Sequence, residues 1–382
     1  MTSMVKVCIV QHRLLHYRTE LFERLRSACA AEGIELMLVH GQATPIEAIR
    51  KDTGQLPWAT EIRNRSCRFG GRDMLWQPLP KAVAGCELIV LMQESRLLSN
   101  YPWLFGFRPR KTRVAFWGHG RNFQSEAPNG WRERWKRRNL RAVDWWFAYT
   151  QMTADIVVEA GFSAERVTVL NNAIDNSSFS ADLASVSDAE VAALRDPITA
   201  GSSATVGLYC GSLYPDKRLD LLLQACEKIV ARQPDFKLVV VGDGPSRALL
   251  EASASSRPWM HWVGVKRGRD KAAWFRAAQL YLSPGAVGLH VLDSFVAGVP
   301  MITTADALHG PEIAYLQDGV NGLITAGDAD SYAQAVLALL QEPERLAAIR
   351  HNAETSATQF TLDQMVDRFC DGIVKCLRQP RL

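Results

Sequence analysis

The stretch S-P-G-A-V-G-L-H-V-L-D-S-F-V-A-G-V-P, residues 283–300, organises the prediction of the fold. It follows the short apolar run Gln279 to Leu282 and leads into the apolar segment P-M-I-T-T. Between these two runs, apolar residues recur with the spacing of one helix face, at Leu292, Phe295 and Val296. Gly298 and Pro300 then end the helix. The stretch therefore predicts a turn and a helix between two buried strands.

The turn before this helix has the features of an anion site. Gly285 and Gly288 let the backbone pass close to a ligand, and a helix start presents unpaired N–H groups with a partial positive charge. His290 and Asp293 lie one turn apart, so we expect both side chains to face a cleft. We interpret the segment as a phosphate-binding turn with a carboxylate beside it, suited to a nucleotide. The alternative is an ordinary strand–turn–helix unit that binds nothing.

The rest of the chain alternates strands with helices, which predicts parallel α/β sheets. Buried strands are expected at residues 5–10, 34–40, 86–92, 113–117, 145–150, 166–172, 205–210, 236–242, 261–265, 279–282 and 321–325. Residues 42–80 give no clear assignment. We predict two Rossmann-like domains facing across a cleft, at residues 1–178 and 205–357. Residues 179–204 form the expected linker, and a final helix at 358–382 packs back on the first domain.

Composition is that of a globular protein, with 382 residues, 47% hydrophobic and 22% charged. No apolar run is long enough to span a bilayer, and the N-terminus enters a strand without the pattern of a signal peptide. The eight cysteines include no C-x-x-C pair. We therefore expect reduced thiols and a cytoplasmic protein.

Positive charge is concentrated in one segment. Residues 103–141 carry eleven Lys/Arg and two Glu, a balance of +9, whereas the whole chain sums to +4. Within that segment an amphipathic basic stretch presents tryptophans and arginines, Trp131, Arg134, Trp135, Arg137 and Arg138. This pattern suits a helix on an anionic membrane surface. A solvated face with core tryptophans is the alternative, and nucleic-acid binding is disfavoured because no recognition motif accompanies the charge.

The opening stretch resembles the nucleotide-binding segment of the family-4 retaining glycosyltransferases, E-G-F-G-L-x-x-L-E-A-x-A-x-G-x-P-V. The matching positions are Gly288, Leu289, Leu292, Gly298 and Pro300. Asp293 replaces the second glutamate and Gly285 stands where the first would be. The form P-G-x-V-G-L resembles a variant branch of that family. The resemblance implies the GT-B fold and a nucleotide-diphosphate sugar as donor.

Further segments resemble donor-binding parts of the family. G-S-L-Y-P-D-K, residues 211–217, is similar to G-R-L-x-x-x-K, so Lys217 takes the place of the family lysine beside the pyrophosphate, with Gly211 before it. Ser212 replaces the family arginine, and whether Arg218 compensates is open. The loops at V-V-V-G-D-G-P and W-V-G-V-K-R resemble those that close around the nucleotide, or are ordinary turns; their candidates are Gly242, Val265 and Lys266.

Candidates in the first half of the chain follow two strands. His119, in G-H-G, is placed by the resemblance near the donor sugar, although a lone histidine is often structural. H-Y-R, comprising His16, Tyr17 and Arg18, resembles the P-x-Y-R start of such transferases. Arg18 could hold an acceptor phosphate or could be a solvated charge. H-G-P-E, residues 309–312, mainly favours a helix start.

The resemblance implies an enzyme that moves a hexose, with retention, to a saccharide acceptor that is carbohydrate or lipid-linked. Bacterial surface polysaccharide assembly at the inner face of the cytoplasmic membrane is the expected setting. His119 and Lys217 are the expected catalytic residues. No cofactor and no metal are expected, since the D-A-D at 328–330 reads as a helix start, and UDP and GDP donors both stay open. Alternatives are a non-catalytic binding or scaffold protein and a sugar-nucleotide epimerase of the same fold. Nicotinamide chemistry is disfavoured because no G-x-G-x-x-G follows the first strand.

Overall fold

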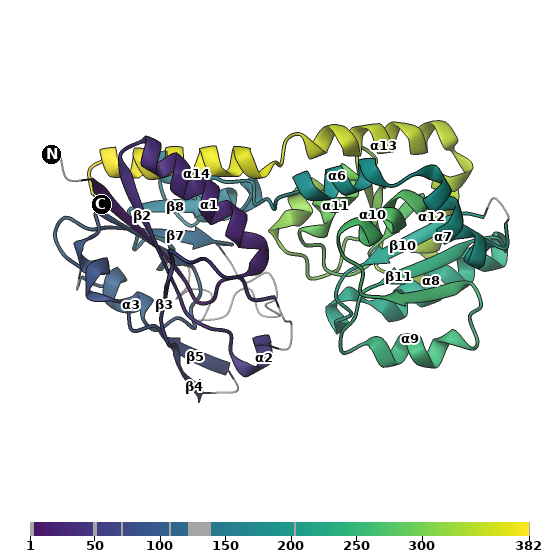
Figure 1. Ribbon diagram of the computed structural model, residues 1–382, viewed down its shortest axis with the longest axis horizontal. Coiled ribbons are helices and arrows are strands. Elements are labelled where there is room, and N and C mark those ends of the chain that lie inside the picture. Colours follow the sequence, from purple (N-terminus) through teal and green to yellow (C-terminus); the bar gives the residue numbers. More distant parts are fainter. Residues whose placement is uncertain are drawn as a thin grey trace. The chain divides into compact units, whose positions relative to one another are not determined.

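A computed structural model describes residues 4–48, 52–69, 72–106, 108–120, 139–201 and 204–381 (Figure 1). The chain divides into two compact units, each described by itself below. Unit 1 comprises Met1–Ile174 and Leu362–Leu382, and unit 2 comprises Asp175–Thr361. Each unit is built on a parallel sheet with helices packed against it, which confirms the prediction of two Rossmann-like α/β domains.

Unit 1 contains a seven-stranded sheet in the order β3-β2-β1-β6-β7-β8-β9, with all neighbours parallel. Its strands are β1 Val5–Gln11, β2 Ile34–His40, β3 Thr60–Glu61, β6 Leu88–Met92, β7 Arg113–Gly118, β8 Trp145–Ala148 and β9 Val167–Val169. The central strands β6, β7 and β8 are buried along most of their length. Burial on both faces explains why they read as continuous apolar runs in the sequence.

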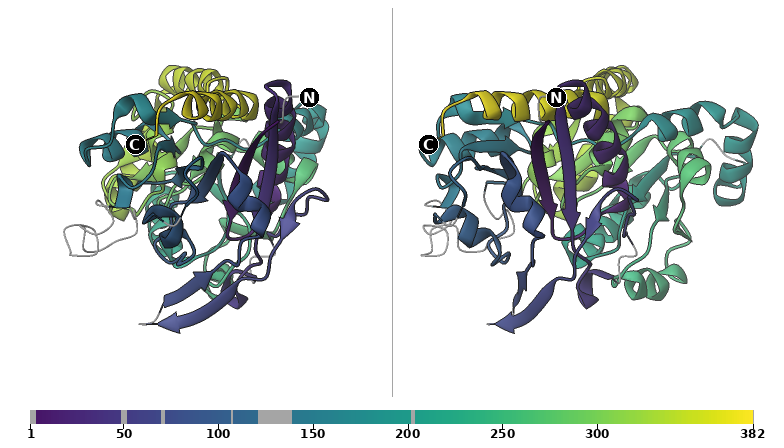
Figure 2. Two further views of the ribbon diagram at one scale, coloured as in Figure 1. Left: turned by 90° about the vertical axis from the view of Figure 1, so that its left-hand side faces the viewer. Right: turned by 60° about the vertical axis from the view of Figure 1, so that its left-hand side comes forward.

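Two helices from opposite ends of the chain lie side by side on one face of this sheet (Figures 1 and 2). Trp117 of β7 contacts Phe22 of α1 (Thr19–Ala31) at 6.2 Å and Phe369 of α14 (Leu362–Arg378) at 5.1 Å between ring centroids. The opposite face is covered by a core that includes Phe116 and Trp146. Because side chains alternate along a strand, β7 supplies Phe116 to one core and Trp117 to the other.

Shorter elements complete unit 1. They are η1 His16–Arg18, α2 Pro45–Ala48, η2 Lys81–Gly85, α3 Asn100–Leu104, α5 Gln151–Glu159 and η3 Ala164–Arg166. The segment that sequence patterns left unassigned holds α2, β3 and an antiparallel pair, β4 Arg65–Phe69 with β5 Arg72–Trp76. Gly and Pro interrupt this segment, so no periodicity marked its short strands.

Unit 2 contains a six-stranded parallel sheet in the order β12-β11-β10-β13-β14-β15. The strands are β10 Val206–Cys210, β11 Lys237–Val241, β12 Met260–Gly264, β13 Leu280–Leu282, β14 Met301–Thr304 and β15 Gly322–Thr325. On one face, α8 (Leu219–Arg232) and α12 (Ala329–Gln341) form a shared core with the sheet. On the other face, Phe275 of α10 (Gly268–Ala277) contacts Tyr281 at 5.6 Å. The remaining elements are η4 Pro215–Lys217, α9 Arg247–Ala254, α11 His290–Val296, η5 Pro311–Tyr315 and α13 Pro343–Ala357.

The expected linker at residues 179–204 is wrong. Residues 177–199 form two helices, α6 Ser177–Ser185 and α7 Asp188–Thr199, which pack against α10 as part of unit 2. A reciprocal capping box between Ser187 and Glu190 starts α7, and Phe179 contacts Phe275 at 5.3 Å. These helices could not be recognised from the polar composition of the segment, because they depend on a few buried contacts and on the capping box of α7.

Candidate functional site

The predicted donor-side residues lie on loops that follow strands of the unit 2 sheet. Parallel strands end at the same edge, where open α/β sheets bind ligands. Strands β10, β11, β12 and β13 are followed, respectively, by Gly211 with Ser212, by Gly242, by Val265 with Lys266, and by residues 283–293. The structure therefore brings these segments to one edge of the sheet, as the sequence indicated.

The loop after β13 is held by side chains from the end of β14. Thr304 Oγ1 donates a hydrogen bond to Pro284 O at 2.7 Å. His309 Nε2 bonds to Thr304 O at 2.7 Å, and its Nδ1 accepts from the Val287 N–H at 3.1 Å. Burial lowers the pKa of His309, which matches the neutral ring that this pair of bonds requires. Sequence reasoning gave His309 no such role, because its partners are backbone atoms of a distant loop.

At the tip of this loop, three consecutive amides have no acceptor among the described residues. The N–H groups of Gly288, Leu289 and His290 donate to no atom of the residues that the structure describes. A Cβ placed on Gly288 would meet no atom within 4 Å, so the space beside the turn is open. The His290 side chain is exposed. Consecutive backbone donors beside open space can bind an oxyanion.

Lys217 lies next to this turn. Its Nζ donates to Ala286 O and is 3.9 Å from Asp216 Oδ2. The Ala286 N–H in turn donates to Asp216 O at 2.9 Å, which joins η4 to the loop. An ammonium carries three donors. The contact to Ala286 therefore fixes the position of a positive charge beside the open turn.

Gly285 corrects one prediction. It was expected to contact the donor, but its Cα packs against the backbone of η4. A Cβ at this position would lie 2.3 Å from Asp216 O and 2.4 Å from Lys217 Cα. Gly285 is therefore a close-packing residue, and the glutamate that the related family carries at this position has no room in this structure.

Asp293 corrects a second prediction. It was expected to face a cleft together with His290, but it is only 3% exposed. Its carboxylate forms an ion pair with Lys271 Nζ at 2.8 Å, and Lys271 lies 4.5 Å from the ring centroid of Phe179. The Asp293 carboxylate is thus occupied inside unit 2. The role of Lys271 could not be recognised from the sequence, because its ion pair with Asp293 joins two different helices, α10 and α11.

Arg218 does not replace the family arginine at Ser212 in this structure. Its Nη1 donates to Asp306 Oδ1 at 2.6 Å and its Nη2 to Gly327 O at 2.8 Å. The guanidinium is therefore used to hold the end of β14. Ser212 itself is exposed, and its carbonyl accepts from the Tyr209 hydroxyl at 2.8 Å.

Two neighbouring loops differ in how tightly they are built. A Cβ on Gly242 would lie 1.8 Å from Gly211 O, and Gly242 has φ +142°, so only glycine fits there. Gly242 is thus a packing position on the site edge, whereas a Cβ on Gly211 would approach only the Tyr209 side chain, at 3.4 Å. Val265 is 55% exposed and Lys266 is partly exposed after β12, where backbone groups could meet a base.

The candidates of unit 1 lie in two loops at the carboxyl edge of its sheet. His119 follows β7, and its ring contacts Tyr149 at 4.3 Å between centroids. His16 is exposed, with its N–H donating to Asp52 O at 2.9 Å, and its ring meets Tyr17 edge-on. Arg18 is only 5% exposed, which excludes a solvated first-turn charge.

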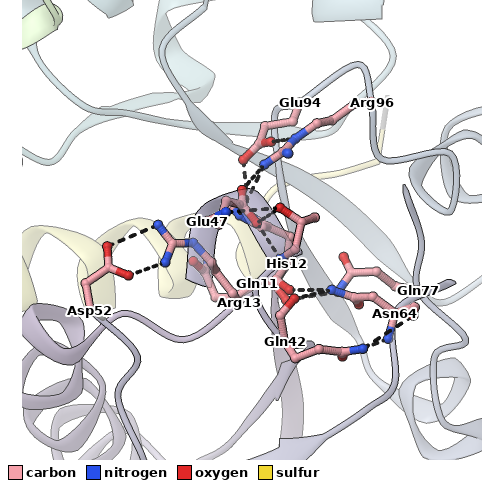
Figure 3. A network of polar contacts seen from close by, with 11 residues as sticks. Gln11, His12, Arg13, Gln42, Glu47, Asp52, Asn64, Gln77, Glu94 and Arg96 are labelled. Atoms are coloured by element: carbon pink, nitrogen blue, oxygen red, sulfur yellow. Dashed lines mark hydrogen bonds and ion pairs between the residues drawn. The ribbon is translucent and has the colours of Figure 1, made fainter. Parts of the chain in front are cut away.

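Sequence reasoning missed a charged network at the same edge (Figure 3). His12 Nε2 lies 3.2 Å from Glu47 Oε1 and its Nδ1 lies 3.2 Å from Glu94 Oε1. Arg96 bridges the same carboxylates, with Nε 2.7 Å from Glu94 and Nη2 2.9 Å from Glu47. Arg96 and, when it is protonated, His12 therefore face two carboxylates across loops that are distant in sequence.

The network shifts the pKa values of its members. Burial alone would lower the pKa of His12, but the hydrogen bonds to Glu47 and Glu94 outweigh it and raise that pKa. Burial would raise the pKa of Glu94, yet His12 and Arg96 lower it to about 2. The carboxylates are ionised at neutral pH, and His12 holds its proton to a higher pH than a free imidazole does.

Amide side chains extend this network (Figure 3). Asn64 Nδ2 donates to His12 O at 2.7 Å, and Gln77 Nε2 donates to Gln11 O at 2.9 Å. Next in the chain, Arg13 pairs with Asp52. The arrangement fixes the loop after β1, from which η1 and Arg18 follow.

The predicted membrane-face residues lie outside the described residues: Trp131, Arg134, Trp135, Arg137 and Arg138. Of the helices that the structure does describe, none has the length and apolar character needed to cross a bilayer. The membrane face thus stays a prediction from sequence.

A segment of unit 2 matches the model of a known protein family. Residues 204–342 match the model described as "Glycosyl transferases group 1". Among curated relatives, a D-inositol 3-phosphate glycosyltransferase 2 of Catenulispora acidiphila is 28% identical over 55% of this chain and 51% of its own. An alpha-monoglucosyldiacylglycerol synthase of Acholeplasma laidlawii is 21% identical over 45% of this chain and 44% of its own. The chain spans about half the length of these relatives.

Solved structures match over almost the whole chain. Anabaena HepE in complex with UDP is 15% identical, with a TM-score of 0.67 over 97% of this chain and 100% of its own. A glycosyltransferase from Rickettsia africae is 13% identical, with a TM-score of 0.70 over 100% of both chains. A putative UDP-N-acetylglucosamine 2-epimerase from Listeria monocytogenes reaches 0.59 at 13% identity over 97% of this chain and 95% of its own. These likenesses show a shared fold, which is the GT-B type that the resemblance implied.

Proposed function

Because residues 204–342 belong to the group 1 glycosyl transferases, we propose that the chain transfers a sugar from a nucleotide-diphosphate donor to a carbohydrate or lipid-linked carbohydrate acceptor. Unit 2 binds the donor and unit 1 presents the acceptor. The proposal extends from the matched segment to the whole protein, and it assigns a hexose as the transferred sugar by resemblance.

One observation carries the proposal. The amides of Gly288, Leu289 and His290 have no acceptor within the described part of the chain, and they lie on a turn that also touches Lys217 through Ala286. A diphosphate supplies the missing acceptors and the negative charge. Backbone donors and an ammonium in a fixed arrangement stabilise charge that develops on a leaving phosphate. The sequence contains no motif that would place a metal ion beside the diphosphate.

This placement of the diphosphate supports the following proposed reaction. The bond between the sugar C1 and the phosphate oxygen breaks, and its electrons stay on the phosphate that the amides and Lys217 hold. The acceptor hydroxyl attacks the same face of C1, which preserves the configuration, and its proton passes to the departing phosphate oxygen. His119, after β7, is proposed to contact the donor sugar.

Lipid-linked acceptors are supported by the names of two relatives. These are the alpha-monoglucosyldiacylglycerol synthase of Acholeplasma laidlawii and a phosphatidyl-myo-inositol mannosyltransferase of Mycolicibacterium smegmatis. The positive segment at residues 103–141 would suit an anionic bilayer. We therefore propose peripheral action on the inner face of the cytoplasmic membrane, in the assembly of a bacterial surface polysaccharide.

A non-catalytic binding protein is the second candidate. Two observations favour it: Ser212 lacks the family guanidinium, and the Asp293 carboxylate is already paired with Lys271. Slow release of nucleoside diphosphate from donor sugars without an acceptor would support the enzyme. Binding without any release, for UDP and GDP sugars alike, would support the alternative.

Calorimetry with UDP, GDP and their sugars tests the donor site through Lys217→Ala. Hydrogen bonds to charged groups contribute about 1.5–3 kcal/mol, so we expect roughly 10- to 100-fold weaker binding. Lys228→Ala is the control, because Lys228 lies on the following helix and pairs with Asp330 at 2.7 Å. Equal, small effects of both substitutions would contradict the placement of the diphosphate.

A further inference from the structure

Arg18 is a buried cation that has no counter-ion among the residues that the structure describes. It is 5% exposed, and its Nη1 is buried with no hydrogen-bond partner. Within the described ranges, no carboxylate forms an ion pair with it. Arg13, which is 7% exposed in the same loop, pairs with Asp52, and Arg108 pairs with Asp144 at 2.8 Å. Among the described residues of unit 1, the buried Arg13 and the partly buried Arg108 each have a carboxylate partner, whereas Arg18 has none.

Aromatic rings surround the Arg18 guanidinium. Its Cζ lies 4.8 Å from the ring centroid of Trp117 and 5.6 Å from those of Tyr17 and Tyr149. Cation–π contacts of this kind are weakly stabilising, whereas the burial of an unpaired ion is strongly destabilising. Ring faces also offer no acceptor oxygen, and Nη1 has no hydrogen-bond partner among the described residues. The rings thus orient the guanidinium but do not neutralise it.

A second donor beside Arg18 is also unsatisfied. Trp117 Nε1 is buried and has no hydrogen-bond partner within the part of the chain that the structure describes. Two neighbouring donors that lack acceptors, one of them cationic, match the needs of an oxyanion. A planar guanidinium binds phosphate or carboxylate oxygens in pairs. Both groups lie where β7 ends, close to Tyr149 and hence to His119.

We propose that Arg18 binds an oxyanion, phosphate or carboxylate, that is carried by the acceptor. The inference rests on the proposed function, since it names the chemistry of the acceptor that unit 1 would present. It predicts that a neutral sugar is a poor acceptor. It also explains why an arginine is kept where burial without a partner lowers the stability of the free protein.

The test compares Arg18→Gln with Arg13→Gln in the full chain. Arg18→Gln removes an uncompensated charge, so unfolding should occur at the same or a higher temperature, while anion binding falls at least tenfold. Arg13→Gln leaves Asp52 unpaired, so it should lower the unfolding temperature and keep anion affinity. Arg18→Lys keeps the positive charge but not the paired donors of the guanidinium, so it should bind the anion with intermediate affinity. This variant replaces Arg18→Gln in the test if the glutamine variant does not fold.

The probes are glucose 1-phosphate, glucuronate and neutral glucose, titrated with saturating UDP or GDP so that the donor site is filled. Binding of glucose 1-phosphate alone identifies a phosphorylated acceptor, and binding of glucuronate alone identifies an acidic sugar. Binding of neither anion, or binding that Arg18→Gln leaves unchanged, overturns the inference. Loss of nucleotide affinity in Arg18→Gln would also overturn it, because Arg18 would then serve the donor. Unchanged nucleotide binding would meanwhile leave the proposed function standing.

Discussion

Introducing a side chain at Gly285 should lower the stability of unit 2, although the related family carries glutamate at the corresponding position. The perturbations are Gly285→Ala and Gly285→Glu. The built Cβ lies 2.3 Å from Asp216 O and 2.4 Å from Lys217 Cα, whereas carbon contacts are optimal near 3.5–4.0 Å. More than 1 Å of separation must therefore be gained by moving η4 or the loop after β13.

The expected loss follows from the kind of atom that is in the way. Overpacking a core costs about 1–3 kcal/mol, and the obstacle here is backbone rather than a flexible side chain. We expect about 3 kcal/mol for alanine and more for glutamate. A domain with the length of Asp175–Thr361 loses roughly 2–4 °C in Tm for each kcal/mol. The Gly285→Ala transition of unit 2 should thus fall by roughly 6–12 °C.

Differential scanning calorimetry measures this shift, and Gly288→Ala is the matched control in the same loop. A Cβ on Gly288 meets no atom within 4 Å, so its stability should change by less than about 0.5 kcal/mol. Donor affinity adds a second reading, since displacing η4 also displaces Lys217. If Gly285→Ala and Gly288→Ala unfold at the same temperature, or if Gly285→Glu binds the donor better than the parent, the packing argument is refuted.

Two further predictions concern buried charges. Lys271→Met leaves the Asp293 carboxylate buried and unpaired, so it should lower the free energy of unfolding, measured by urea titration, by about 3–5 kcal/mol. Adding Asp293→Leu should recover most of that loss. Equal losses in the single and double variants would contradict the pairing. The raised pKa of His12 means that its protonated form is stabilised by folding, so its contribution is present below about pH 6.5 and is lost as the pH rises through the folded pKa. The difference in unfolding free energy between the parent and His12→Gln should therefore shrink from pH 6 to pH 9, and a constant difference would rule out a charged His12.

The regular parts of both sheets could be predicted because buried parallel strands leave continuous apolar runs, as in residues 86–92 and 113–117. Helix α7 could not, because its stability depends on the cap at Ser187 and on contacts with α10 rather than on a strong apolar face. Likewise, G-D-G-P could be placed on the site edge, but the contact of Gly242 with Gly211 could not.

Residues of the candidate site could be predicted only where their role depends on residues that are near them in the sequence. Lys217 and the turn at Gly288 lie close to strands that the pattern identifies, so their positions at one sheet edge followed. The prediction for Asp293 was wrong because its partner, Lys271, comes from another helix. His12, Glu47 and Glu94 were missed for the same reason: their loops meet only after the sheet has ordered β1 and β6 side by side.

Helix α14 has a consequence for biosynthesis. Unit 1 needs its apolar face, with Met365, Phe369 and Ile373 buried, yet this helix leaves the ribosome only after all of Asp175–Thr361. At about 5–20 residues per second, the first sheet remains for roughly 10–40 s with one apolar face covered by α1 but not by α14, while unit 2 can already fold. The nascent chain should therefore bind ribosome-associated chaperones through the side of β7 that carries Trp117. This binding should end when α14 has been synthesised and packs on that face.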